Sequence, residues 1–184
     1  MARFEPLDPA FEARVRASFA RQRAMALVGA KLGAVRPGEV EIELAYREDL
    51  TQQHGFIHGG IVGMIADSAS GYAAFSLMPA DASVLTVEYK LNLLAPAEGS
   101  CLIARGRVVR PGRTLVVAEA RVAALQAGKE VEIAASLSTL MTLLGRPDGP
   151  TVGSGGDAPA DRHPSQGVRF PLKSRNDPPG GAVP

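Results

Sequence analysis

The spacing of hydrophobic and polar residues predicts a domain built mainly of β-strands. Val40, Ile42 and Leu44 alternate with glutamates, which is the period of a strand with one solvated face. Four more runs are rich in strand-forming residues and are separated by turn residues, at positions 83–94, 101–110, 114–126 and 129–144. Because the separators are short, we expect consecutive strands to pair as an antiparallel meander.

The first third of the chain mixes helical and strand patterns. Phe11, Val15 and Phe19 recur every four residues and predict an amphipathic helix within residues 1–24. The next apolar run, at 25–35, contains two glycines, and we interpret it as a first strand.

Residues 57–80 form the longest apolar segment of the chain. Their side chains are small and apolar around the whole helical circumference, which is typical of a helix buried on all sides. Asp67 lies near the middle, several glycines and serines interrupt the run, and no basic cluster flanks it. These features argue against a membrane span, although the length would suffice for one.

The order of elements predicts an α+β fold in which an antiparallel sheet buries one long helix against its concave face. We expect an N-terminal helical segment at 1–24, the main domain at 25–144 and a tail at 145–184. The tail is rich in Pro and Gly and lacks periodicity, so we expect it to be disordered.

Charge and cysteine content narrow the classes of function. Among 184 residues, Lys and Arg number 20 against 19 Asp and Glu, and aromatic residues make up 5%, which disfavours nucleic acid as a partner. Cys101 is the only cysteine, so no disulfide forms within the chain, and no apolar leader follows the first residues. We therefore expect a cytoplasmic protein. The three histidines and one cysteine lack ligand spacing, so no metal site is predicted.

Asp67 is the most informative candidate for chemistry, because it is the only firmly charged side chain between residues 57 and 80. A buried carboxylate needs partners or a raised pKa, and groups of that kind are enriched at functional sites. The alternative is a capping or solvent-facing Asp.

Three segments resemble the PaaI-type hotdog-fold acyl-CoA thioesterases over most of residues 11–144: TQQHGFIHGGIVGMIADSA, LTVEYKLNLLAPAEG and RVVRPGRTLVVAEARV. In that family H-G-G opens the central helix and an acidic residue follows the His by nine positions, as Asp67 follows His58 here. The resemblance implies hydrolysis of an acyl-CoA to free acid and CoA. It implies no cofactor, because CoA is part of the substrate. The mixture of Met64, Tyr72, Phe75 and Met78 in the helix suits either a medium-chain or an aryl-acyl group.

Helix geometry separates the two ends of this motif. Nine helical residues rise about 13 Å and rotate about 900°, which leaves His58 and Asp67 on opposite sides of one helix. If both serve one reaction, the second group must come from another subunit, so the sequence predicts a homodimer with two equivalent sites. The resemblance implies the same arrangement, as a homodimer or a homotetramer.

The H-G-G turn and Asp67 have definite expected roles. A helix N-terminus presents unpaired N–H groups, so Gly59 and Gly60 would form an oxyanion hole, unless the pair only permits tight packing. His58 would orient this turn or polarise the thioester. Asp67 would attack the carbonyl or act as general base on water, and the sequence leaves both open. Thr86 would orient that water or the carboxylate, unless it is simply a strand residue.

Other residues have weaker expected roles. Gln52 stands where related enzymes often carry Asn, which puts its substrate-orienting role in doubt, and His54 is a possible substitute. The turn at Arg110, Gly112 and Arg113 offers two guanidinium groups for the phosphates of CoA.

Glycines also mark one face of the predicted apolar helix. Gly59, Gly63 and Gly71 share this face with Asp67 at four-residue spacing. They leave either space for an acyl chain or room for close backbone packing.

Two other functions fit parts of the sequence. A hotdog dehydratase or hydratase acting on 3-hydroxyacyl thioesters also pairs a His with a helix carboxylate across a dimer, but its His is usually surrounded by Phe and Pro. A non-catalytic acyl-CoA sensor would keep the pocket and tolerate Asn or Ala at position 67. The H-G-G motif argues against the first and Asp67 argues against the second.

Overall fold

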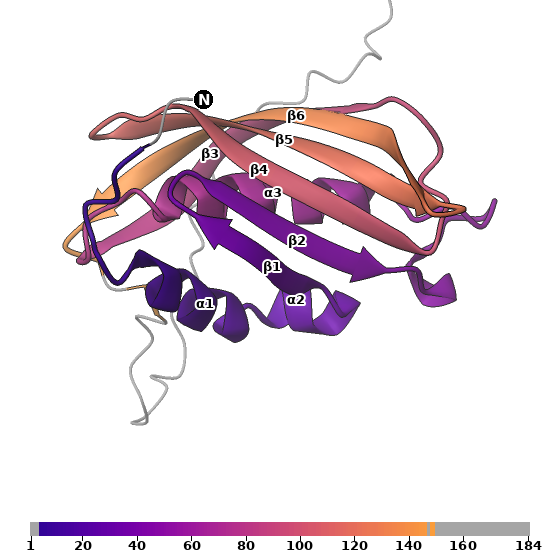
Figure 1. Cartoon of the computed structure of the whole chain (residues 1–184), viewed down its shortest axis with the longest axis horizontal. Helices are drawn as coiled ribbons and strands as arrows, with labels where there is room; N and C mark the ends of the chain where they lie inside the picture. Colours follow the sequence, from indigo (N-terminus) through magenta and orange to yellow (C-terminus); the bar gives the residue numbers. More distant parts are fainter. Residues whose placement is uncertain (1–3, 147, 150–184) are drawn as a thin grey trace, which may run out of the picture. The chain divides into compact units, whose positions relative to one another are not determined.

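The computed structural model describes residues 4–146 and 148–149. Most of the predicted tail at 145–184 therefore lies outside the described residues. The helices and strands, labelled in Figure 1, are α1 (Phe11–Arg21), α2 (Arg23–Val28), β1 (Lys31–Arg36), β2 (Glu39–Ala45), a 3₁₀ turn η1 (Glu48–Leu50), α3 (Gly59–Phe75), β3 (Ala82–Leu93), β4 (Cys101–Arg110), β5 (Leu115–Gln126) and β6 (Lys129–Leu144).

The six strands form one antiparallel sheet in the order β1-β2-β4-β5-β6-β3. The predicted meander is confirmed for β4, β5 and β6, but it is wrong for β3, which pairs with β6 at the edge of the sheet. The reason lies in the link at 94–100, which passes across the end of the β5–β6 hairpin. There Leu94 N–H donates to Ile133 O (2.8 Å) and Ser100 N–H to Leu125 O (3.0 Å).

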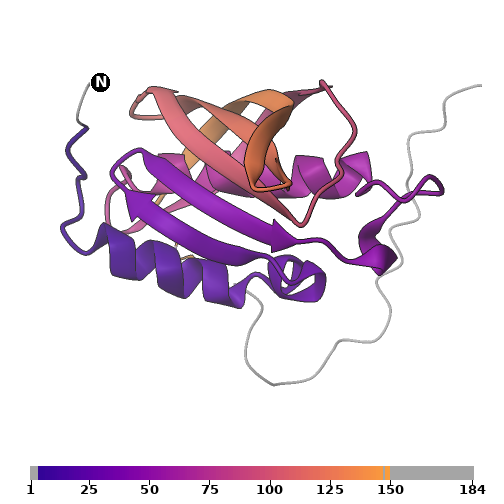
Figure 2. The same ribbon diagram turned by 45° about the vertical axis from the view of Figure 1, so that its right-hand side comes forward.

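The sheet curves around α3, as Figure 2 shows, and this confirms the predicted fold class. Small side chains allow the helix to lie very close to the strands. A Cβ added at Gly106 of β4 would come within 2.1 Å of the Ala69 carbonyl oxygen of α3, so only glycine fits at this contact. The C-terminal half of α3 is almost completely buried, as the apolar pattern predicted.

Helix α1 packs against the C-terminal end of α3 and confirms the predicted amphipathic helix. Val15 is fully buried, and Phe11 and Phe19 pack against the core. Arg14 donates from its guanidinium to the carbonyl oxygens of Phe75 (3.2 Å) and Met78 (2.7 Å). The same guanidinium lies over the Phe75 ring, 4.2 Å from its centre, so α1 is fixed to the end of α3.

The interpretation of residues 25–35 as one strand is wrong, because a short helix precedes β1. Met25 and Val28 are buried one helical turn apart, which an apolar run cannot distinguish from a strand pattern. Gly29 ends α2 with φ of 76°, and Ala30 N–H donates to Met25 O (2.9 Å). Within the part of the chain that the structure describes, no helix is long and apolar enough to span a bilayer.

Candidate active site

Asp67 and Thr86 meet between α3 and the edge strand β3. The Thr86 hydroxyl donates a hydrogen bond of 2.9 Å to Oδ1 of Asp67, and both residues are half-buried. Burial raises the pKa of Asp67 because it disfavours the charged form, and the Thr86 hydrogen bond partly offsets this rise. The arrangement yields an oriented carboxylate with increased basicity.

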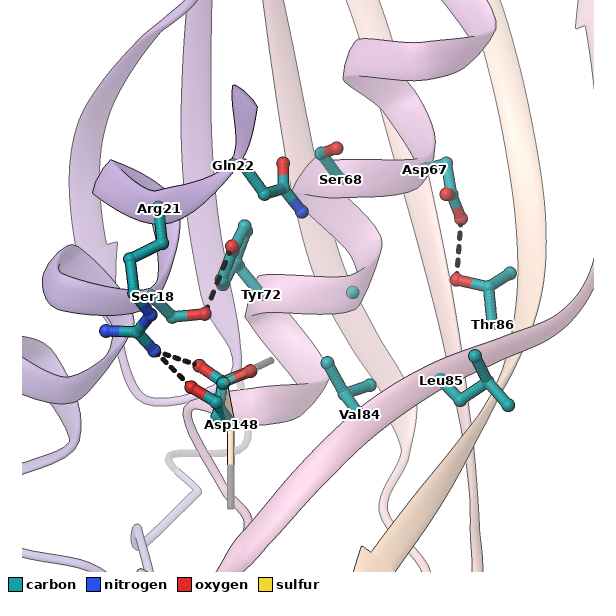
Figure 3. A pocket seen from close by; sticks show the side chains of 12 residues that line it. Ser18, Arg21, Gln22, Asp67, Ser68, Tyr72, Val84, Leu85, Thr86 and Asp148 are labelled. Atoms are coloured by element: carbon teal, nitrogen blue, oxygen red, sulfur yellow. Dashed lines mark hydrogen bonds and ion pairs between the residues drawn. The ribbon is translucent and has the colours of Figure 1, made fainter. Parts of the chain in front are cut away.

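A cavity of about 530 Å³ opens beside this carboxylate. One face of α3 forms its floor, β3 forms one wall, and the end of α1 with the residue that joins it to α2 forms the other, called here the α1–α2 wall (Figure 3). The lining residues are Asp67, Ser68, Gly71 and Tyr72 from α3, Val84, Leu85 and Thr86 from β3, Ser18, Arg21 and Gln22 from the α1–α2 wall, and Asp148 and Gly149.

The α1–α2 wall is polar, and none of its residues was predicted as part of the site. Ser18 Oγ and Tyr72 Oη are hydrogen-bonded at 3.2 Å, and Arg21 forms an ion pair of 2.8 Å with Asp148. Gln22 places its Oε1 out of reach of solvent with no hydrogen-bond partner among the described residues. Ser18 of α1 and Gln22, which follows the last residue of α1, are four residues apart, and in the sequence this spacing is equally typical of a solvent-facing stripe.

His58 caps the N-terminus of α3 with its side chain. Its Nδ1 accepts a hydrogen bond of 2.9 Å from the Gly60 N–H. In a neutral imidazole whose Nδ1 is an acceptor, the proton is on Nε2, which can then donate to a ligand. The ring is exposed, and His58 does not line the Asp67 cavity. The structure therefore does not bring these two residues together within one chain.

The two glycines after His58 differ in what their N–H groups can offer. The Gly60 N–H is engaged by His58, whereas the Gly59 N–H has no acceptor among the described residues. Of the two predicted donors, only the Gly59 N–H is therefore free of an acceptor among the described residues, and the oxyanion hole itself stays a prediction.

The glycine stripe of α3 is close to β3 at one end and open at the other. A Cβ at Gly59 would come within 2.8 Å of Leu93, and one at Gly63 within 3.3 Å of Leu91 and Tyr89. These two glycines allow close packing against β3. Gly71 is buried, yet a Cβ there would meet nothing within 4 Å, because it faces the cavity. Only the end of the stripe therefore provides free space for a ligand.

Gln52 and His54 lie in the loop that leads into α3. Oε1 of Gln52 accepts a hydrogen bond from the His54 N–H, so the amide is turned back on its own loop. The loop is fixed by backbone bonds, including one of 2.9 Å from His58 N–H to Leu50 O. Neither Gln52 nor His54 lines the Asp67 cavity. Within one chain, Gln52 is placed to shape the turn before His58.

The β4–β5 hairpin carries the three residues predicted to contact CoA. Arg110 and Arg113 are exposed, and Gly112 and Arg113 line a second cavity of about 550 Å³, whose other walls include Leu77 and Met78. None of the hairpin residues lines the Asp67 cavity. The hairpin and the carboxylate are therefore separate within one chain.

Comparison with known proteins agrees with this fold and this motif. A solved structure from Silicibacter pomeroyi, described as a thioesterase family protein, is 53% identical to this chain. The match covers 73% of this chain and 99% of that one, with a TM-score of 0.73. Residues 54–131, which include the H-G-G turn, α3 and β3, match the family model of the thioesterase superfamily. The chain belongs to the thioesterase superfamily.

Two relatives of lower identity carry names of their own. A Halobacterium salinarum protein named as an esterase is 36% identical over 100 residues, covering 52% of this chain and 66% of that protein. The 1,4-dihydroxy-2-naphthoyl-CoA hydrolase of Listeria monocytogenes is 24% identical over 95 residues, covering 52% and 77%. The chain thus spans slightly less than two thirds of the Halobacterium relative.

The PaaI protein of E. coli, from the phenylacetic acid degradation operon, has a similar structure. The TM-score is 0.67 and the match covers 76% of this chain and 98% of that one, at 16% identity. At this identity the likeness concerns the fold alone. It confirms the hotdog thioesterase fold. It does not identify the substrate of this thioesterase superfamily member, which has to be inferred from the candidate site.

Proposed function

We propose that the protein is an acyl-CoA thioesterase that hydrolyses a medium-chain or aryl-acyl-CoA to the free acid and CoA. The observation that carries this proposal is the Asp67 carboxylate, oriented by Thr86 at the wall of a cavity of about 530 Å³. Membership of the thioesterase superfamily supports thioester hydrolysis, and the Listeria hydrolase supports a CoA thioester.

Asp67 activates the attacking group in this proposal. Thr86 holds Oδ1, which leaves Oδ2 to accept a proton from water or to attack the carbonyl itself. As a general base, Asp67 takes the proton while the water oxygen bonds to the thioester carbon. The tetrahedral intermediate then expels the CoA thiolate, which receives that proton. As a nucleophile, Asp67 would bond to the thioester carbon and expel the CoA thiolate, and water would then hydrolyse the resulting mixed anhydride to the free acid and the original carboxylate.

The start of α3 stabilises the charge that develops on the carbonyl oxygen. The Gly59 N–H and Nε2–H of His58 are the donors available there, and the helix dipole adds to them. One preorganised donor of this kind typically contributes about 3 to 4 kcal/mol to transition-state stabilisation. His58 thus both caps the helix and polarises the thioester.

A second copy of the chain brings these two groups together. Among the described residues no strand pairs with the outer edge of β3, where Leu85, Val87 and Leu93 are each more than half exposed. Long exposed apolar edges of this kind pair with another strand. We therefore propose that two copies of β3 pair antiparallel about a two-fold axis near Val87, which also leaves assembly of two dimers into a tetramer open.

The positions at which α3 contacts β3 support this assembly. Gly59 lies beside Leu93 at the end of β3, whereas Asp67 bonds to Thr86 nearer its start. Antiparallel pairing brings the end of one β3 beside the start of the other. The His58 turn of one copy then approaches the Asp67 cavity of the second copy, which completes the site.

The hairpin at Arg110, Gly112 and Arg113 is the proposed contact for the phosphates of CoA. Both guanidinium groups are exposed beside a tight turn and provide planar donors for phosphate oxygens. Gln52 and His54 are proposed to shape the approach to the His58 turn from their loop.

Thiol release from acetyl-, hexanoyl-, decanoyl-, palmitoyl- and phenylacetyl-CoA tests the proposal, with wild type run beside Asp67→Asn. Turnover that falls about 10²- to 10⁴-fold in the variant is the expected result. If wild type releases no thiol from any thioester while still binding it, the enzyme proposal is wrong and the sensor or dehydratase function takes its place. Addition of water to a 2-enoyl-CoA, followed by absorbance, distinguishes these two.

A further inference from the structure

We infer that the second cavity, at the C-terminal end of α3, is a binding site for a carboxylate with an aliphatic tail. The cavity has a volume of about 550 Å³, and Asp67 does not line it. Its walls come from the start of the chain, the end of α3 with the residues that follow it, the β4–β5 hairpin, and the strands β5 and β6. The inference goes beyond the proposed function, which uses only the hairpin among these walls.

Two leucines present apolar surface to solvent at this cavity. Leu7 is 71% exposed and Leu144 is 56% exposed, and both line the cavity. Leu77 and Met78 are buried and extend the aliphatic lining. A flexible methionine adapts well to a ligand of variable shape, such as an alkyl chain. A tail that covers the two exposed leucines would remove their surface from water, which favours binding.

Arg113 supplies a cation to the same cavity. It is exposed, and it forms no ion pair with any residue that the structure describes. A guanidinium binds a carboxylate through two parallel hydrogen bonds. Glu5 is the other charged residue of the lining and repels an anion. The carboxylate of the ligand is therefore directed to the hairpin, and its tail to the aliphatic lining.

The form of the cavity favours a small molecule over a protein partner. Small-molecule sites are concave and mostly apolar, measure about 300 to 1,000 Å³, and contain a few polar groups that fix the orientation of the ligand. This cavity fits that description, with Arg113 as the orienting group. A stable protein partner would instead need a patch of about 800 Å² on each side.

In the proposed enzyme, this site would make the reaction sensitive to its own product. The free acid that the proposed reaction releases belongs to the class of ligand inferred here. Arg113 is also one of the proposed contacts for the phosphates of CoA, so a bound acid would compete with CoA for that guanidinium. This consequence rests on the proposed function, whereas binding of the acid does not.

Calorimetric titration of the full chain with octanoate, octylammonium and acetate tests the inference without any turnover. Octanoate should bind wild type with a Kd of about 1 mM or tighter. Octylammonium lacks the anionic head and acetate lacks the tail, so both should bind about tenfold or more weakly. Arg113→Gln and Leu7→Ser should each weaken octanoate binding about fivefold or more. Arg110→Gln on the same hairpin and Leu27→Ser on α2 change exposed residues that do not line the cavity, so these matched controls should leave octanoate binding unchanged.

Two results would overturn the inference: no binding of octanoate by wild type, or binding that either Arg113→Gln or Leu7→Ser leaves unchanged. The second result would mean that the acid binds elsewhere, for example in the Asp67 cavity. All four substituted side chains are exposed, so the fold should be retained, and thermal melts of each variant check this. Thiol release decides the proposed function separately, because octanoate binding requires no activity. In an active enzyme, octanoate should inhibit wild type more strongly than Arg113→Gln, and equal inhibition would exclude this cavity as the site of product inhibition.

Discussion

The Thr86 hydroxyl and the Asp67 carboxylate, 19 residues apart in sequence, form a hydrogen bond of 2.9 Å that connects α3 to β3, the edge strand of the sheet. Because that edge is also the proposed dimer interface, the orientation of the carboxylate depends on the strand through which two copies meet. In the proposed enzyme, catalysis and assembly would therefore be coupled at one residue of β3.

Replacing Thr86 by Val tests this coupling, because Val has the shape of Thr without its hydroxyl. The Thr86 hydrogen bond lowers the pKa of Asp67, so its loss should raise that pKa further. A base is active only when deprotonated, so the acidic limb of the kcat/KM profile should move to higher pH. At neutral pH kcat should fall about 10- to 100-fold through misplacement of the carboxylate. Thr86→Ser, which keeps the hydroxyl, should retain the wild-type profile, and an unshifted limb in Thr86→Val would refute this role.

We also predict that ionised Asp67 lowers the stability of the fold, although the proposed activity requires it. Its pKa is raised in the folded state, so its contribution to stability is complete below the ordinary pKa of Asp, about 3.9. That contribution is lost as the pH rises through the raised value, because the folded state must then hold a buried charge. Asp67→Asn should therefore melt at a higher temperature than wild type at neutral pH.

The control is the pH dependence of the difference in melting temperature between wild type and Asp67→Asn. Below about pH 4 both side chains are neutral, so the difference in melting temperature should shrink. Thermal melts of wild type and Asp67→Asn from pH 3.5 to 8 measure it. A difference that stays constant over this range would mean that ionisation of Asp67 does not contribute.

Much of this candidate site can be predicted from the sequence, because several of its residues lie close together along the chain. The H-G-G turn and the carboxylate lie on one helix, and their separation of nine residues sets them on opposite faces. Thr86 was selected by its place in the motif that follows. The α1–α2 wall did not follow, because Ser18 contacts Tyr72 across 54 residues of sequence. Such a contact depends on how α1 packs, which helix periodicity does not specify.

The errors in the fold have similar physical causes. The residues before Gly29 are apolar at spacings that suit both a strand and a single helical turn, and the left-handed backbone of Gly29 ends the helix. The placement of β3 beside β6 was missed because a short link was assumed to join neighbours. A segment of seven residues is long enough to cross the end of a hairpin, as the link at 94–100 does.

Glycines of similar appearance in the sequence should respond oppositely to alanine. At Gly106 a Cβ would lie 2.1 Å from Ala69 O and 2.6 Å from Ser70 N, so β4 and α3 would have to separate. Gly106→Ala should lower the free energy of unfolding by about 1 to 3 kcal/mol or more. At Gly71 the Cβ enters open space, so Gly71→Ala should raise it by about 0.5 to 1 kcal/mol through helix propensity. Urea unfolding measures both, and equal effects would contradict the packing described.

A charge at the middle of β3 should weaken the proposed dimer. Near the two-fold axis Val87 of one copy lies close to Val87 of the other, so Val87→Lys sets two like charges against each other. By analytical ultracentrifugation, the dissociation constant of the Val87→Lys dimer should be about tenfold or more above that of wild type. Activity should be lost over the same range of protein concentration. Leu27→Lys, on the exposed surface of α2, is the control and should change neither. A fully active monomer would refute the shared site.

Mixed dimers provide the sharpest test of a site built from two chains. His58→Ala and Asp67→Asn should each be nearly inactive, because every site in either dimer lacks one group. After subunit exchange of equal amounts, half of the dimers carry one of each chain. In those hybrids one site has both defects and the other has neither, so total activity should recover to about a quarter of that of wild type. If instead His58 and Asp67 of the same chain formed the site, every site would keep one defect and mixing would restore nothing. Thiol release measured before and after exchange, with exchange confirmed by mass spectrometry of a tagged chain, distinguishes these outcomes.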